Sequence, residues 1–389
     1  MAFSAAGESL GHPRLRGLLY QALLVLAVLT LVCGAGYNAY VNMRARGIPL
    51  GFGFWDETAG FDVNLHLIPY SPLSSYGRAF WVGLINTLLI AALAIPLATF
   101  FGVVIGLARL SPNWLMSRGA LAYTNVVRNT PLLLQLLFWY NVVLKSLPAP
   151  RQSIRLGNAI FLNSRGLFLP APVPTVEAVW FAAAIGFALV AGSAFAAWAR
   201  RRQATTGAQS PTLAVNALLV IGLPAIAAAT TGAPFTFDAP ALAGFNLKGG
   251  IPIMPELAAL AFGLVIFTSA FIAEIVRAGV LSVPRPQTEA AMALGLHRGL
   301  VTRLVIIPQA LRLIVPPLTS QYLNVVKNSS LAVFIGYPDL VQIFAGTVLN
   351  QTQAAVQVMS VTMAVYLVIS LAVASVLNAY NASSALKER

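Results

Sequence analysis

The sequence has little charge for its length. Of its 389 residues only 9% are Asp, Glu, Lys or Arg, whereas 58% are hydrophobic. Because soluble globular domains carry about a quarter charged residues, this composition excludes an ordinary soluble domain and favours a membrane protein. The few charges are unbalanced, with 24 basic against 11 acidic residues. We attribute this excess to membrane orientation, since Lys and Arg accumulate in cytoplasmic loops, and expect no nucleic-acid partner.

Residues that carry cofactor or redox chemistry are also scarce. Cys33 is the single cysteine, so an intrachain disulfide is excluded. The three histidines, His12, His66 and His297, are far apart in the sequence and show no metal-ligand spacing. No phosphate-binding loop of the form GxxxxGK[ST] is present. We therefore expect a chain that is not an enzyme and that holds no cofactor or metal of its own.

Long hydrophobic runs dominate what remains. A helix needs roughly 20 apolar residues to cross a bilayer, and such runs must be helical because lipid offers no partners to backbone polar groups. The sequence predicts an all-α membrane protein with about eight transmembrane helices. They cover residues 18–40, 80–107, 130–147, 176–199, 212–231, 256–280, 309–326 and 354–380. The seventh contains Pro316 and Pro317, runs into NVVKNSSLAVFIG and is expected to be broken.

An even number of spans places both termini on one side of the membrane. Lys and Arg are more frequent in the loops on that side, with Arg200–Arg202 as the strongest group, which predicts an N-in, C-in topology. We divide the chain into a first helix with an external segment (1–79), a first core part (80–147), an insertion with external caps and two extra helices (148–253), and a second core part (254–389). The external segments are rich in Pro and Gly and are expected to be turn-rich caps.

One polar segment, residues 282–308, interrupts this apolar pattern on the predicted cytoplasmic side. It reads SVPRPQTEAAMALGLHRGLVTRLVIIP. Pro286 fits a first helical turn, Thr288 and Glu289 favour a helix start by capping and dipole effects, and Gly295 can end the helix at positive φ. The segment is either an amphipathic helix at the membrane interface or a docking element. In the second case Met292, Leu294 and Leu296 would fill a pocket of another protein.

The same segment resembles the EAA loop of ABC importer permeases. The matching residues are Glu289, Ala290, Ala291, Gly295, Val305, Ile307 and Pro308, where Val305 and Ile307 replace the commoner Ile and Leu. Stretches such as VVRNTPLLLQLLFWY and VVKNSSLAVFIGYPDL extend the likeness, over most of residues 50–385, to polar amino acid permeases of the general L-amino acid branch. The resemblance implies that the short helix is a coupling helix seated in a groove of a separate ATPase subunit. Its residues would be Glu289, Ala290, Ala291, Met292, Leu294, Gly295 and Leu296.

This family resemblance also implies a function and partners. The expected function is the permease subunit of an ATP-driven importer of L-amino acids in the bacterial inner membrane, working by alternating access. Its partners would be ATPase subunits that bind ATP and Mg, a second permease subunit (a paralogue or an identical copy), a periplasmic amino acid-binding protein and membrane lipid. An ion-coupled secondary transporter, which would not need the EAA loop, and a non-transporting membrane scaffold are the alternatives.

Polar residues inside predicted spans are costly and therefore mark candidate sites for substrate. Glu274 and Arg277 lie three residues apart on one helix. They form either a structural ion pair or, with Glu274 facing the transport path, a contact to a substrate ammonium. Gln135 either bonds a neighbouring helix or contacts substrate.

A second polar group follows the two prolines of the seventh span. It consists of Lys327, Asn328, Ser329 and Ser330. Non-helical backbone at membrane depth is tolerated only inside protein or beside a water-filled cavity, and broken helices in transporters present their ends to charged ligands. Lys327 is expected either to attract a substrate carboxylate or to extend to the membrane surface.

Overall fold

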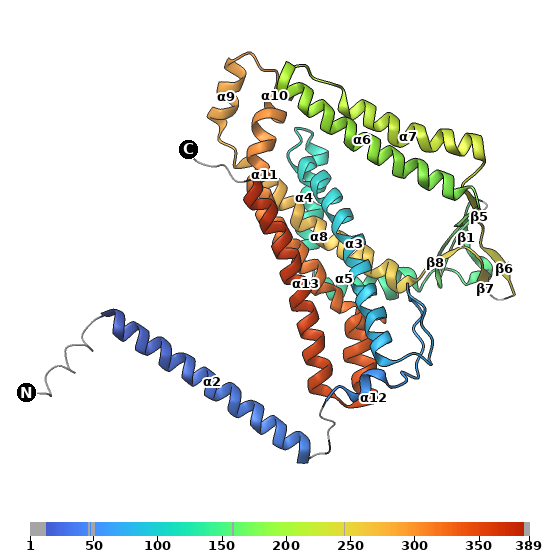
Figure 1. Cartoon of the computed structure of the whole chain (residues 1–389), viewed down its shortest axis with the longest axis vertical. Helices are drawn as coiled ribbons and strands as arrows, with labels where there is room; N and C mark the ends of the chain where they lie inside the picture. Colours follow the sequence, from blue (N-terminus) through green and yellow to red (C-terminus); the bar gives the residue numbers. More distant parts are fainter. Residues whose placement is uncertain (1–12, 46, 48–50, 158, 245, 385–389) are drawn as a thin grey trace, which may run out of the picture. The chain divides into compact units, whose positions relative to one another are not determined.

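A computed structural model describes residues 13–384, apart from 46, 48–50, 158 and 245 (Figure 1). The chain divides into two compact units. The first comprises residues 1–128 and 264–389, and the second comprises residues 129–263. The predicted insertion, 148–253, lies within the second unit.

Seven helices among the described residues are long and apolar enough to cross a membrane, which confirms the helical membrane class. They are α2 (Pro13–Ala45), α3 (Tyr76–Arg109), α6 (Ala178–Thr206), α7 (Thr212–Thr231), α8 (Pro255–Leu281), the run Arg298–Ile335 and α13 (Ala355–Ser384). The predicted span at 130–147 corresponds to a shorter apolar helix, Leu132–Leu144. It consists of α5 (Leu132–Leu137) and the π-helical η2 (Phe138–Leu144).

The first unit also contains a helix that the sequence did not predict. It is α4 (Trp114–Asn129), which lies between α3 and α5 along the chain. The remaining short elements of this unit are η1 (Gly53–Asp56), α9 (Arg285–Ala293), η6 (Val341–Val348) and α12 (Leu349–Thr352).

The aromatic core of the first unit is formed by residues of η1, α3, η6 and α13. Phe54, Phe80, Phe344 and Val358 are buried in it. Trp55 covers the start of α3 so closely that a Cβ on Gly77 would lie 2.3 Å from the indole nitrogen. The segment before α3 is therefore folded onto the helices.

Glycines bring α3 and α8 into close contact. A Cβ on Gly102 would lie 2.5 Å from the Ile272 side chain, and a Cβ on Gly106 would lie 2.8 Å from the Ala273 carbonyl oxygen. The spacing Gly-x-x-x-Gly is typical of membrane helices whose backbones approach each other. This contact places the ends of α3 and α8 beside each other.

The seventh predicted span is not broken at its prolines. The run Arg298–Ile335 consists of α10 (Arg298–Val301), the π-helical η4 (Thr302–Ile306), α11 (Ile307–Asn328) and the 3₁₀ helix η5 (Ser329–Ile335). Pro316 and Pro317 lie inside α11 with exposed side chains, while Ile314 and Leu318 on the opposite face pack into a buried cluster with α8. This packing keeps the helix intact despite the missing N–H donors. The span was predicted to be broken, and its α-helix does end within the polar group, at Asn328, where the 3₁₀ helix η5 begins, rather than at the prolines.

The second unit adds short strands to the helical fold. A four-stranded antiparallel sheet has the order β1-β2-β3-β8, and two further pairs are β4-β5 and β6-β7. The strands are β1 (Ile154–Leu156), β2 (Ile160–Asn163), β3 (Gly166–Leu169), β4 (Ala171–Pro174), β5 (Phe235–Asp238), β6 (Ala241–Ala243), β7 (Asn246–Lys248) and β8 (Ile251–Ile253). Helices α6 and α7 form a hairpin between β4 and β5, which pair antiparallel and close its base (Figure 1).

Candidate functional site

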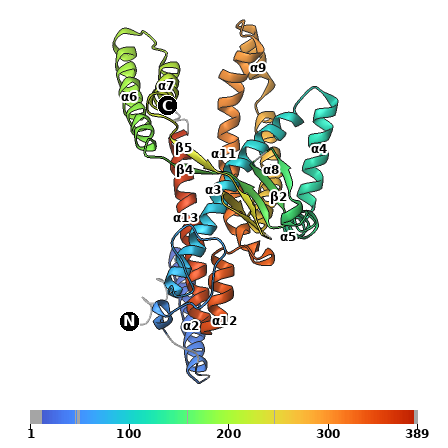
Figure 2. The same ribbon diagram turned by 90° about the vertical axis from the view of Figure 1, so that its right-hand side faces the viewer.

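The predicted short helix of the 282–308 segment is present as α9, between α8 and α10 (Figures 1 and 2). Pro286 lies in its first turn and Gly295 follows it at φ +81°, both as predicted. The predicted capping was wrong. The helix begins at Arg285, so that Thr288 and Glu289 come too late to cap it, and Pro284 precedes it without a side-chain cap. The rigid φ values of the two prolines set its start.

The residues predicted to dock differ in their exposure. Met292 is 44% exposed and Leu294 is 83% exposed, in and directly after a helix of nine residues that is too short to cross a membrane. Glu289, Ala290 and Gly295 are also exposed. In contrast, Ala291 is buried and Leu296 is half-buried, and Ala291 accepts a hydrogen bond from the Leu296 backbone N–H. One side of α9 is thus available for a partner, and the other packs on the chain.

Both ends of the segment are fixed to the first unit. Val283, two residues before α9, is buried in a cluster with Val276 of α8 and with Ala310 and Ile314 of α11. Val301 of α10 is also buried. The segment that carries α9 is therefore attached at both ends to packed helices, and a displacement of α9 would be transmitted to α8 and α11.

Glu274 of α8 is held by two guanidinium groups. Arg277 donates to its carboxylate, with Nη2 2.5 Å from Oε1, as the spacing predicted. Arg109, the last residue of α3, donates to the other carboxylate oxygen. No local sequence pattern indicates this second partner, which is 165 residues away. The same Glu274 borders a cavity of about 340 Å³ whose other lining residues include Leu313 and Pro317 of α11.

The polar group 327–330 is helical rather than an irregular break. Lys327 is exposed in the last turn of α11 and forms no ion pair within the described part of the chain. Asn328 is half-buried. The Ser329 and Ser330 hydroxyls donate to the carbonyl oxygens of Val326 and Lys327, at 2.8 and 2.7 Å. The two serines thus satisfy their hydroxyls locally, and Lys327 has the only charge of the group.

A polar stripe along α11 leads to Lys327. The exposed residues Ser320, Asn324 and Lys327 recur at helical spacing, and Pro317, one turn before Ser320, borders the cavity beside Glu274. Ser320 and Asn324 were not predicted, because the two prolines were taken to weaken this helix and only the polar group after it was considered. Counting back from Lys327 in steps of three and four would have found them.

Gln135 lies in the second unit, in the first turns of α5. Its side chain is buried, and its amide nitrogen donates to the carbonyl oxygen of Thr130 at 3.0 Å. Nearby, the Tyr140 hydroxyl donates to the Glu256 carboxylate at 2.7 Å. The bond of Gln135 supports the start of α5 after Pro131.

A family model described as the binding-protein-dependent transport system inner membrane component matches residues 94–385. The chain belongs to this family. The matched region begins within α3 and includes α9, Glu274 and all of α11. The match therefore includes the whole EAA-like segment, residues 282–308.

Several curated proteins are similar to this chain over nearly its whole length. A protein of Escherichia coli strain K12 named as an amino-acid ABC transporter permease, YhdX, is 49% identical over 98% of this chain and 97% of its own length. The general L-amino acid transport system permease protein AapQ of Rhizobium johnstonii is 44% identical, covering 97% and 94%. BztB of Rhodobacter capsulatus, a glutamate/glutamine/aspartate/asparagine transport system permease protein, is 39% identical, covering 97% and 95%.

These findings confirm the family recognised from the EAA-like segment. The chain is a permease of the amino acid ABC transporter family, with the fold of ABC importer permeases, and is a multi-pass protein of the inner membrane. It is a transport component rather than an enzyme.

Proposed function

We propose that this permease forms the transmembrane path of an ATP-driven importer of L-amino acids and that α9 couples it to a separate ATPase subunit. The observation that carries the proposal is the exposed apolar side of α9. Leu294 and Met292 project from a helix whose flanks are buried among α8 and α11. The resemblance of this segment to the EAA loop supports reading these exposed side chains as the ones that would be buried in a groove of the ATPase subunit.

Coupling follows from how α9 is attached. ATP and Mg would bind to the partner ATPase, since this chain has no phosphate-binding loop. Closure of the ATPase pair would displace α9, with Glu289, Ala290, Met292, Leu294 and Gly295 at the contact, and Ala291 and Leu296 supporting it from behind. Because Val283 and Ala310 are packed together, α8 and α11 would move with α9 and alternate the access of the path.

The substrate path is proposed to follow the polar stripe of α11. The Lys327 ammonium would attract the α-carboxylate of an amino acid, and Ser320 and Asn324 would offer hydrogen bonds along the way. Glu274 borders the adjoining cavity, and its carboxylate is engaged by Arg109 and Arg277. We therefore favour a structural role for Glu274 over capture of a substrate ammonium. The names of AapQ and BztB support amino acids as the substrate class.

The complete transporter would need further partners. We propose a second permease subunit, either a paralogue or a second copy of this chain, and a periplasmic amino acid-binding protein that delivers substrate to the external segments. In the proposed N-in, C-in orientation, α9 lies on the cytoplasmic side, where an ATPase has access to ATP.

The test is uptake of radiolabelled amino acids into proteoliposomes that hold the assembled complex with its ATPase and binding protein. Leu294→Ser removes one exposed apolar side chain, whose burial contributes roughly 1.5–3 kcal/mol, so we expect ATP-dependent uptake to fall about tenfold or more. Val176→Ser is the matched control, because Val176 is 84% exposed and lies beside α6 in the external segment. We expect uptake by this variant to be unchanged.

Two outcomes would contradict the proposal. Uptake that proceeds without ATP would indicate ion-coupled transport. Equal uptake by the Leu294→Ser and Val176→Ser complexes, with the ATPase still bound, would show that α9 is not the coupling element.

A further inference from the structure

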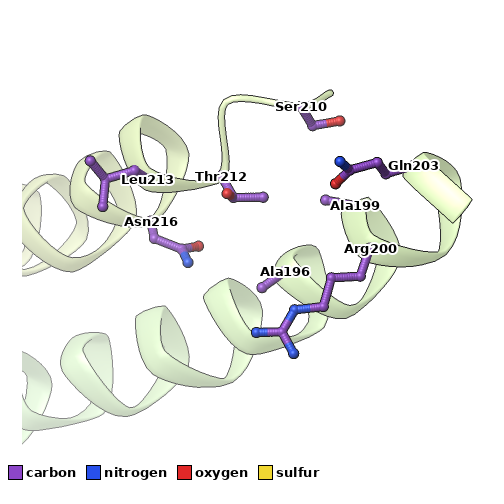
Figure 3. A pocket seen from close by; sticks show the side chains of 8 residues that line it. All are labelled: Ala196, Ala199, Arg200, Gln203, Ser210, Thr212, Leu213 and Asn216. Atoms are coloured by element: carbon purple, nitrogen blue, oxygen red, sulfur yellow. The ribbon is translucent and has the colours of Figure 1, made fainter. Parts of the chain in front are cut away.

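The second unit contains a polar pocket at the turn of the α6–α7 hairpin (Figure 3). The cavity has a volume of about 380 Å³. Its polar lining consists of Arg200 and Gln203 near the end of α6, Ser210 in the turn, and Thr212 and Asn216 in the first turns of α7. Gly207, at φ +72°, ends α6 and allows the tight return of the chain. The pocket thus joins two helices and their connection.

The electrostatics of this pocket favour an anion. Residues 178–231, which form the hairpin, include Arg200, Arg201 and Arg202 and no Asp or Glu. The N-terminus of α7 begins at Thr212 in the pocket wall, and a helix N-terminus adds a partial positive charge. The hairpin therefore offers hydrogen-bond donors and positive charge that its own residues do not neutralise.

The polar wall is also not satisfied by the chain alone. The Asn216 side-chain oxygen is buried and has no hydrogen-bond partner among the described residues. It lies against Gly192 of α6, where a Cβ would be 3.0 Å away, so that the missing side chain admits the amide between the helices. This oxygen is an acceptor and faces α6, so the group that Asn216 can offer to an anion in the pocket is its amide NH2.

The position of the pocket at one end of α7 points to a lipid headgroup as its ligand. Helix α7 has 20 residues, about 30 Å or one hydrocarbon thickness, and its exposed apolar side chains are those of a lipid-facing helix. The pocket at its first residues therefore lies at headgroup level. Trp198 is half exposed, with the Arg202 guanidinium 5.3 Å from its ring centroid, and such side chains anchor a helix at the membrane surface.

We propose that this pocket binds the headgroup of an anionic phospholipid. The phosphodiester would lie at Arg200 and the start of α7, with the hydroxyls and amides of Ser210, Thr212 and Asn216 around it. The acyl chains would run along the apolar surface of the hairpin, beginning at the exposed Leu213 on the rim. The predicted orientation places the site in the cytoplasmic leaflet, which is rich in anionic lipid. The hairpin would thus act as a lipid anchor for the insertion.

The test is lipid binding to the full-length chain purified in detergent, measured by native mass spectrometry during titration with dioleoyl phosphatidylglycerol or dioleoyl phosphatidylcholine. Hydrogen bonds to charged groups contribute about 1.5–3 kcal/mol, so Arg200→Gln should weaken phosphatidylglycerol binding about tenfold. Thr212→Val keeps the net charge and should weaken it severalfold. Binding of phosphatidylcholine should not change.

Arg118→Gln in α4 is the matched control, since Arg118 is exposed and is not part of the pocket. It should change phosphatidylglycerol binding less than twofold. Equal losses in Arg118→Gln and Arg200→Gln, or an unchanged Thr212→Val, would show diffuse charge attraction and overturn the proposal. Displacement of bound lipid by millimolar inorganic phosphate would instead assign the site to a soluble phosphate compound and equally overturn it.

Discussion

At the scale of single residues, Glu274 is the clearest case of a charge whose partners define its role. Its carboxylate bridges Arg109 of α3 and Arg277 of its own helix. The i, i+3 spacing made the Arg277 contact predictable. Arg109 is 165 residues away, and its contact depends on how α3 packs on α8, which no local pattern records.

Neutralising this carboxylate should reduce stability and leave substrate affinity intact. Glu274→Gln would leave two guanidinium groups facing an amide, and the loss of charge-assisted hydrogen bonds costs about 1.5–3 kcal/mol in total. We expect a lower thermal midpoint in detergent and an unchanged KM for uptake. A double-mutant cycle with Arg109→Gln should show coupling between the two positions. A raised KM at unchanged stability would place the carboxylate in the substrate path instead.

At the scale of elements, the contact between α3 and α8 depends on Gly102 and Gly106. A methyl group on Gly106 would overlap the Ala273 carbonyl oxygen and Val276. Since the obstacle is partly backbone, relief requires the two helices to separate. Arg109, one turn beyond Gly106, would then move away from Glu274.

Gly106→Ala should therefore destabilise the protein by about 1–3 kcal/mol, the usual cost of overpacking, as measured by thermal unfolding in detergent. Gly119→Ala is the control, because Gly119 lies in α4 with open space around it. There the substitution should be neutral or slightly stabilising, since Ala favours helix over Gly. Similar destabilisation in both variants would mean that the close contact does not matter.

The elements also show where prediction from sequence succeeds. Pro286 and Gly295 act locally, so the extent of α9 followed from them. The integrity of α11 did not, because packing of Ile314 and Leu318 outweighs the local effect of Pro316 and Pro317. Helix α4 was missed since it has no long apolar run, which was the criterion for a span. The exposure of Leu294 needed the structure, because sequence alone does not separate an outward side chain from a buried one.

At the scale of the whole molecule, the composition and the length of the apolar runs were sufficient to predict a membrane protein. They were not sufficient to predict which distant segments pair. Strands β3 and β8 pair Leu167 with Ile253 across the intervening hairpin. Likewise, Asn86 of α3 donates to the carbonyl oxygens of Leu65 and Pro338, each at 2.8 Å. These contacts join parts of the chain that lie far apart in sequence, and each depends on the fold being complete.

Asp339, in the turn between η5 and η6, makes stability of the entire fold depend on pH. Its carboxyl group is fully buried and accepts hydrogen bonds from the Gln342 backbone N–H and the Tyr366 hydroxyl, at 2.8 and 3.3 Å. Burial raises the pKa of the Asp339 carboxyl from 3.8 to about 7, and the hydrogen bonds offset only part of this rise. The folded protein therefore favours the protonated form.

Because the pKa of Asp339 is raised on folding, its favourable contribution is complete below about pH 4 and is lost as the pH rises through about 7. The Asn side chain of Asp339→Asn cannot ionise, so the variant should gain stability relative to the parent between pH 5 and pH 7, by at most about 1.4 kcal/mol per pH unit. Thermal unfolding in detergent at several pH values measures the difference. Asp56→Asn, at an exposed position, should show no such trend. A difference that is flat or opposite in sign for Asp339→Asn would mean that the folded protein holds this carboxylate charged.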